Sequence, residues 1–72
     1  MNQTISELRT QVQTALLQDD LLQDFGIEVL DSNGVVTLRG AVPTTEARER
    51  AEAVARTVDG VTSVINEIDV VS

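Results

Sequence analysis

The chain has 72 residues, a formal net charge of -7 and no cysteine. This length predicts one domain, residues 1–72, which buries only about 60% of the surface that its unfolded form exposes, so a deep substrate pocket is not expected. The missing cysteine excludes disulfides and thiolate metal sites, and the acidic charge opposes nucleic acid and anionic bilayers as partners.

The first predicted helix runs from Ile5 to about Gln18. A capping box from Thr4 to Glu7 marks its start, and apolar residues then recur three and four positions apart, which is the spacing of one helical stripe. The stripe consists of Ile5, Leu8, Val12, Ala15 and Leu16. Leu17 lies on the opposite side, so we expect it to be exposed or to turn inward where the helix ends.

A short turn is expected after this helix. Asp19 or Asp20 can cap one further turn before Gly26 releases the chain. Phe25 is the only aromatic residue, and we interpret it as a core side chain that closes the space under this connection. Asp24 adds a third carboxylate, and the three together would hold a hard cation only weakly. The spacing is not that of an EF-hand loop, so no dedicated metal site is expected.

The dipeptide Asn33-Gly34 between two runs of alternating apolar residues predicts a β-hairpin, because both turn positions tolerate a positive φ. A two-residue loop gives the pairs Val29 with Leu38, Asp31 with Val36, and Glu28 with Arg39. A four-residue loop gives Val29 with Val36 and Ile27 with Leu38. Both registers bury Ile27, Val29, Val36 and Leu38. They leave Leu30, Val35 and Thr37 on the other face, and Gly40 is predicted to end the second strand.

A second helix is predicted from Thr45 to Val58, with Thr44 as its N-cap after Pro43. Its inward stripe consists of Ala47, Ala51, Val54, Ala55 and Val58. The alanines indicate that the helix lies close to the sheet. Its outer, solvated face carries Glu46, Arg48, Glu49, Arg50, Glu52 and Arg56. On that face we expect the i to i+4 pairs Glu46 with Arg50 and Glu52 with Arg56.

Residues 64–71 alternate as a third strand after Asp59-Gly60 ends the helix. The set predicted to face the helices is Val64, Asn66, Ile68 and Val70. The opposite set is Ile65, Glu67, Asp69 and Val71. Asn66 is the polar member of the inward set, and we interpret it as a side chain that forms hydrogen bonds with nearby backbone.

The order helix-strand-strand-helix-strand predicts an α+β fold, a two-layer sandwich in which two helices cover one face of a three-stranded mixed sheet. A crossover through the second helix would place the third strand parallel to the second, in sheet order 1-2-3. The alternative places the third strand beside the first and makes the sheet antiparallel throughout.

The run from Asn33 to Pro43, the Arg/Glu/Ala helix after it and the run from Asp59 to Asn66 together resemble the BON domain, a family named for bacterial osmotically inducible and nodulation proteins. The resemblance covers about Ile5 to Val70. It implies the same order of elements, no catalytic residues, and a transport-associated role in binding phospholipid or holding proteins at membranes. Some cytoplasmic relatives are linked to potassium.

Function is predicted from what the chain contains and lacks. No His, Cys, Lys, Tyr or Trp is present to serve as a base, nucleophile or tuned acid, so neither an enzyme nor a cofactor site is expected. We expect a binding module that contacts membrane phospholipid or an envelope or membrane-associated protein. Its candidate residues on the uncovered sheet face are Leu30, Val35, Thr37 and Ile65. The alternative is a structural or sensory domain that self-associates weakly through its sheet edges or responds to ions such as potassium.

The start of the chain does not look like a signal peptide, because polar Asn2, Gln3 and Thr4 follow Met1. We expect a cytoplasmic protein if the chain is complete as written. We expect a cell-envelope or periplasmic domain if it was cut from a longer secreted protein.

Overall fold

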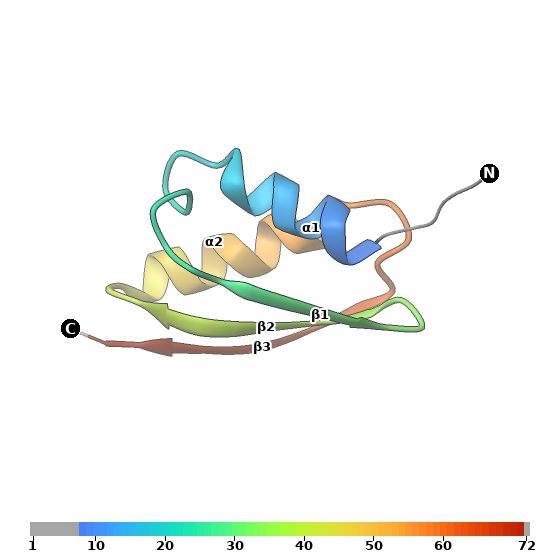
Figure 1. Cartoon of the computed structure of the whole chain (residues 1–72). Coiled ribbons are helices and arrows are strands. Elements are labelled where there is room, and N and C mark those ends of the chain that lie inside the picture. Colours follow the sequence, from blue (N-terminus) through green and yellow to red (C-terminus); the bar gives the residue numbers. More distant parts are fainter. Residues whose placement is uncertain (1–7, 72) are drawn as a thin grey trace.

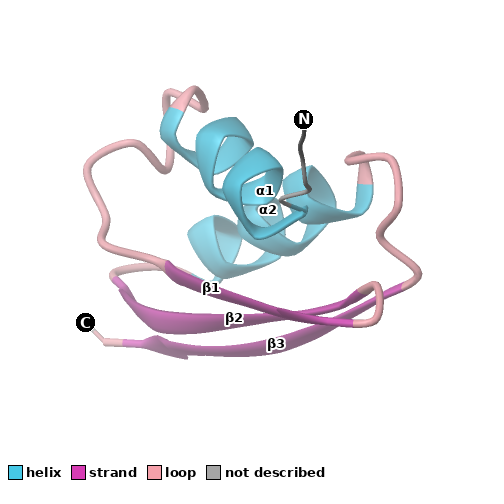
Figure 2. Cartoon of the chain, turned by 45° about the vertical axis from the view of Figure 1, so that its right-hand side comes forward, coloured by secondary structure: helices cyan, strands magenta, loops and turns pink. Residues whose placement is uncertain are grey.

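The computed structural model describes residues 8–71 as two layers, a three-stranded sheet with both helices on one of its faces (Figure 1, Figure 2). The elements are α1 Leu8–Leu17, β1 Glu28–Ser32, β2 Val35–Val42, α2 Thr45–Arg56 and β3 Ser63–Val70. The sheet order is β1-β2-β3, with β2 antiparallel to β1 and parallel to β3. The predicted α+β class, mixed sheet and order are confirmed, and the fully antiparallel alternative is wrong.

The hairpin between β1 and β2 has a two-residue loop, one of the two loops that the sequence allows. Asn33 and Gly34 have φ values of 53° and 87°, as a tight turn matching the twist of the two strands requires. Val29 therefore pairs with Leu38, and the register of the four-residue loop is wrong. One turn thus fixes which side chains of both strands reach the core.

A single apolar core fills the space between the sheet and the helices. It consists of Val12, Leu16, Leu22, Ile27, Val29, Val36, Leu38, Val42, Ala47, Ala51, Ala55 and Ile68. The predicted inward set of the hairpin and the three alanines predicted to face inward from α2 are all in this list. Val54, Val58 and Phe25 are partly buried against it, so Phe25 packs at the core margin as expected.

The connection between α1 and β1 forms the expected extra turn. The carbonyl of Asp19 accepts hydrogen bonds from the N–H groups of Leu22 and Gln23, at 3.0 and 2.9 Å. Leu22 is thereby buried, whereas Leu17 is 55% exposed. The predicted capping box and Ile5 lie outside the described residues.

Gly40 does not end the second strand, because β2 continues to Val42. Its φ is +148°, and a Cβ built on it would lie 3.0 Å from the carbonyl oxygen of Gly26. The glycine therefore lets the chain that enters β1 pass close to β2. The extra length of β2 brings Val42 into the core.

Two other details differ from the sequence prediction. The helix α2 ends at Arg56 instead of Val58, and the hydroxyl of Thr57 after it donates to the carbonyl of Val54 at 2.6 Å. Val70 was expected to face the helices but is 42% exposed. It is the last residue of an edge strand, so only Val42 flanks it in the sheet.

We predict that Gly40→Ala lowers the free energy of unfolding by about 1–3 kcal/mol, because the new methyl group meets backbone and the residue keeps an unfavourable φ. Urea denaturation followed by circular dichroism measures this change. Gly26→Ala is the matched control, since a Cβ there meets nothing within 4 Å, and it should change stability by less than about 0.5 kcal/mol. Equal stability of the two variants would contradict the close approach at Gly40.

Candidate functional site

The sheet face opposite the helices is the candidate binding surface, and we call the group Leu30, Val35, Thr37 and Ile65 the open face. Leu30 and Ile65 are exposed, whereas Val35 and Thr37 are half-buried. Leu30, Thr37 and Ile65 lie in one row across the three strands, and Val35 lies two residues before Thr37 on β2. Leu30 and Ile65 are 38% and 45% exposed. The four residues predicted from the sequence therefore lie side by side.

The open face borders a shallow hollow of about 440 Å³. Besides the four predicted residues, its lining contains Asp31, Ser32 and Asn33 from the hairpin. These three residues were not among those predicted from the sequence. Ser32 could have been found from the hairpin register, because a two-residue loop sets Ser32 opposite Val35 on the same face. The hollow thus combines apolar side chains with a few polar groups at the hairpin turn, which is the kind of lining that binding sites have.

A charged row lies next to the open face. Arg39 and Glu67 are neighbours in the parallel register of β2 and β3, and their side chains approach to 3.2 Å between Nε and Oε1. The expected partner Glu28 does lie opposite Arg39, but the ion pair forms with Glu67. The side chains of Arg39 and Glu67 are 57% and 50% exposed. An ion pair this exposed contributes at most about 1 kcal/mol to the stability of the fold.

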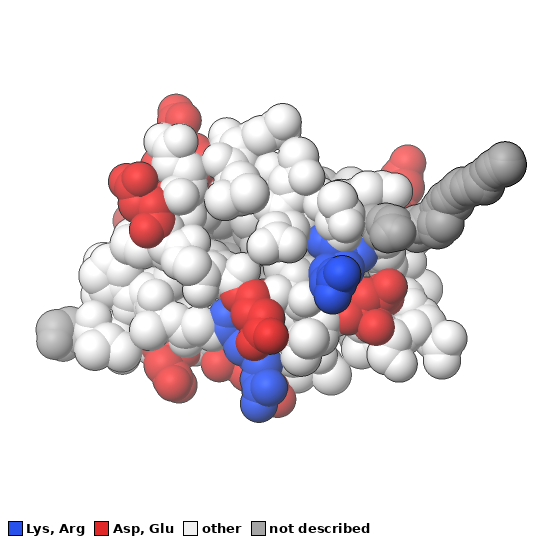
Figure 3. All heavy atoms as spheres, in the orientation of Figure 1, with Lys and Arg blue, Asp and Glu red and all other residues white. Residues whose placement is uncertain are grey.

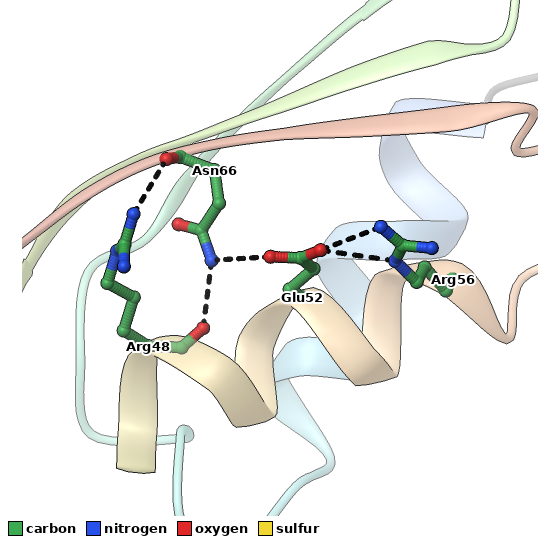
Figure 4. A network of polar contacts seen from close by, with 4 residues as sticks. All are labelled: Arg48, Glu52, Arg56 and Asn66. Atoms are coloured by element: carbon green, nitrogen blue, oxygen red, sulfur yellow. Dashed lines mark hydrogen bonds and ion pairs between the residues drawn. The ribbon is translucent and has the colours of Figure 1, made fainter. Parts of the chain in front are cut away.

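Asn66 connects β3 to α2, as Figure 4 shows. Its Nδ2 donates to the carbonyl of Arg48 at 3.0 Å and to Oε1 of Glu52 at 3.3 Å, while its Oδ1 accepts from the N–H of Ile68 at 3.1 Å. The interpretation of Asn66 as a residue bonded to nearby backbone is confirmed. Its side chain is satisfied within the protein and is therefore not available for a ligand.

Arg48 was expected on the solvated face of α2 but is half-buried and reaches β3 (Figure 4). Its Nε donates to the carbonyl of Ile68 at 3.0 Å, and its Nη2 donates to the carbonyl of Asn66 at 3.3 Å. The N–H of Ile68 is also taken by a side chain, so these backbone groups lie on the edge of β3 away from β2. Arg48 and Asn66 therefore obstruct strand pairing at the middle of this edge.

Glu52 completes this network. Its Oε2 accepts from Arg56 at 2.8 Å, which confirms the predicted i to i+4 pair. The hydrogen bond from Arg56 and the weaker one from Asn66 hold the pKa of Glu52 below its ordinary value.

A second recess of about 500 Å³ lies beside the turn after α1. It is lined by Gln18, Asp19, Asp20, Leu21, Glu46 and Arg50. Arg50 does not pair with Glu46 as expected; its Nε lies 2.8 Å from Oδ2 of Asp19, whose Oδ1 accepts from the N–H of Leu21 at 3.0 Å. The hydrogen bond from Arg50 is the main cause that lowers the pKa of Asp19. Asp19 thus ties the turn to α2.

Between residues 8 and 71, no three side chains of His, Cys, Asp or Glu gather in a way that would hold a metal ion. In the same part of the chain, no helix combines the length and the apolar character needed to cross a membrane.

Comparison with known proteins identifies related sequences. The family model of the BON domain matches residues 4–72. The osmotically-inducible protein Y of Escherichia coli (strain K12) is 37% identical over 59 residues, which are 82% of this chain. The matched segment spans only 29% of that relative's own length.

We predict that Asn66→Ala lowers the free energy of unfolding by about 1–3 kcal/mol, because it leaves the N–H of Ile68 and the carbonyl of Arg48 without this partner. Urea denaturation measures the loss. Glu67→Ala, one residue along on the other face, removes an exposed ion pair and should cost at most about 1 kcal/mol. A smaller loss for Asn66→Ala than for Glu67→Ala would show that the network is not stabilising.

We also predict a pH-dependent contribution from Asp19. Its pKa is lower in the folded chain than the ordinary value of 3.8, so its ion pair stabilises the fold above that value and the contribution is lost as the pH falls through the lowered pKa. Asp19→Asn should therefore be less stable than the wild type near neutral pH, and the difference should shrink in acid. Thermal midpoints across a pH series measure this, with Asp59→Asn as the charge-matched control. Parallel pH profiles of the wild type and Asp19→Asn would contradict the assignment.

Proposed function

The chain belongs to the BON-domain family, and on that premise we propose that it is a non-enzymatic binding module whose open face docks a membrane-associated protein. The observation that carries this proposal is the exposed apolar hollow, in which Leu30, Val35, Thr37 and Ile65 lie together on a sheet face that no described element covers. Apolar groups gathered in one place on a small domain are typical of interaction sites. The relative is named as osmotically inducible, and we propose the same stress setting for this chain.

The charge of the chain favours a protein over an anionic bilayer as the occupant. The formal net charge is -7 and the sequence contains no lysine, so phospholipid phosphates would be repelled at long range. In the view of Figure 3 the basic groups lie beside acidic ones, and acidic groups also occur alone at the margins. This arrangement leaves apolar contact as the main means of attachment.

The absence of histidine and cysteine favours a binding role over an enzymatic one. The sequence has no His or Cys, and the hollow beside the open face is lined by Asp31 as its one carboxylate. A single exposed carboxylate lacks the partner group that acid–base or nucleophilic catalysis requires.

Co-sedimentation with membranes tests this function. The purified chain should sediment with native membranes of the bacterium that produces it, and protease treatment of those membranes should abolish the binding. Ile65→Glu should reduce the bound fraction about tenfold or more, because it places a charge in the centre of the apolar contact. Leu17→Glu is the matched control, since Leu17 is 55% exposed and lies on α1, away from the open face.

Protein-free vesicles separate the two classes of occupant. If the chain binds neutral, protein-free vesicles as strongly as native membranes, lipid is the occupant of the open face. Binding of Ile65→Glu at the wild-type level, or no binding of the wild type to any membrane, would contradict the proposed function. Circular dichroism of both variants checks that they remain folded.

A further inference from the structure

The sheet face opposite the helices is divided along its length into an uncharged half, which contains the apolar side chains of the open face, and an acidic half. The residues on this face form successive rows across the strands: Ser32, Val35 and Ser63; Leu30, Thr37 and Ile65; Glu28, Arg39 and Glu67; Ala41 and Asp69. Each row is two residues further along strands that rise about 3.3 Å per residue, so neighbouring rows are roughly 7 Å apart. The uncharged rows lie at the hairpin end, and the charged rows lie at the end where β2 leads to α2.

The charged half carries an excess of negative charge. Glu28 and Glu67 flank Arg39 on its two sides, and Asp69 lies two residues beyond Glu67. Within the described residues of this face, three carboxylates thus oppose one guanidinium, and all four side chains are exposed. Arg39 bonds to Glu67, so the remaining negative charge is available to a cation on a partner.

A helix is the element that we expect to pack on this sheet face. A further strand adds to a sheet through its edge, whereas a sheet face packs against the apolar stripe of a helix. Both helices of this chain already cover the opposite face (Figure 2). Because one helical turn advances about 5.4 Å, a helix that places an apolar side chain on the row of Leu30 and Ile65 reaches the row of Glu28 after about one further turn and the row of Asp69 after about two and a half.

We propose that the open face and the adjoining acidic rows bind an amphipathic helix of the partner, with leucine-like residues over Leu30 and Ile65 and with lysine or arginine over Glu28 and Asp69. This inference rests on the proposed function and specifies the chemistry of the partner. A second copy of the chain does not fit, because it carries the same net charge of -7 and presents the same acidic rows. An anionic bilayer is disfavoured for the same reason.

Peptide titration followed by amide NMR signals tests the proposal. The probe is a synthetic amphipathic helix of leucine and lysine, and the matched peptide has glutamate at each lysine position. The lysine peptide should shift the signals of Leu30, Thr37 and Ile65, and the glutamate peptide should not. The double variant Glu28→Gln with Asp69→Asn should weaken binding about tenfold at low salt and by less at high salt.

The control is the double variant Asp20→Asn with Asp59→Asn, which removes the same charge from exposed positions on two loops. It should bind the lysine peptide as the wild type does. Shifts spread over the helices instead of the open face would overturn the proposal, as would equal loss of affinity in the two double variants. If both peptides bind the open face equally, the proposed basic charge of the partner helix is wrong, and the open face is still the docking surface. If native membranes also fail to bind, the proposed function fails as well.

Discussion

The middle strand β2 divides its side chains between the two faces of the sheet, and both the core and the candidate site depend on this division. Val36 and Leu38 are fully buried beneath the helices, while Val35 and Thr37 lie on the opposite face. A shift of one residue in the hairpin would expose the first pair and bury the second. The turn at Asn33-Gly34 therefore determines both which side chains of β2 form the core and which form the open face.

Both helices among the described residues lie on one face of the sheet, and no described element covers the other face. Two helices suffice for one apolar core, and the alanines of α2 let that helix lie close to the sheet. On the outer edge of β3, Arg48 and Asn66 bind the backbone of residues 66 and 68. This edge is thus partly closed to another strand, as edge strands in stable proteins often are. We therefore place the partner on the sheet face rather than on the edge of β3.

The local features of the fold could be predicted from the sequence, and the long-range polar contacts could not. The turn residues limited the hairpin register to two alternatives, and Thr44 caps α2 as predicted by accepting a hydrogen bond from the N–H of Ala47, because both features depend on neighbouring residues. Arg39 pairs with Glu67, and Arg50 with Asp19, because the crossover and the turn after α1 bring distant segments together. The open-face residues were identified because alternation alone determines their side of the sheet. The inward position of Arg48 had only an indirect signal, namely that Asn66 on the helix-facing side required polar partners.

The central claim, that the open face docks a membrane-associated protein, can be measured directly because the chain contains no cysteine. A polarity-sensitive dye attached to the single cysteine of Ile65→Cys reports on the open face, and the same dye on Leu17→Cys reports on α1. The account predicts that native membranes shift the emission of the dye at position 65 to the blue, that protease-treated membranes do not, and that the dye at position 17 is unaffected. A blue shift at position 17 with none at position 65 would contradict it.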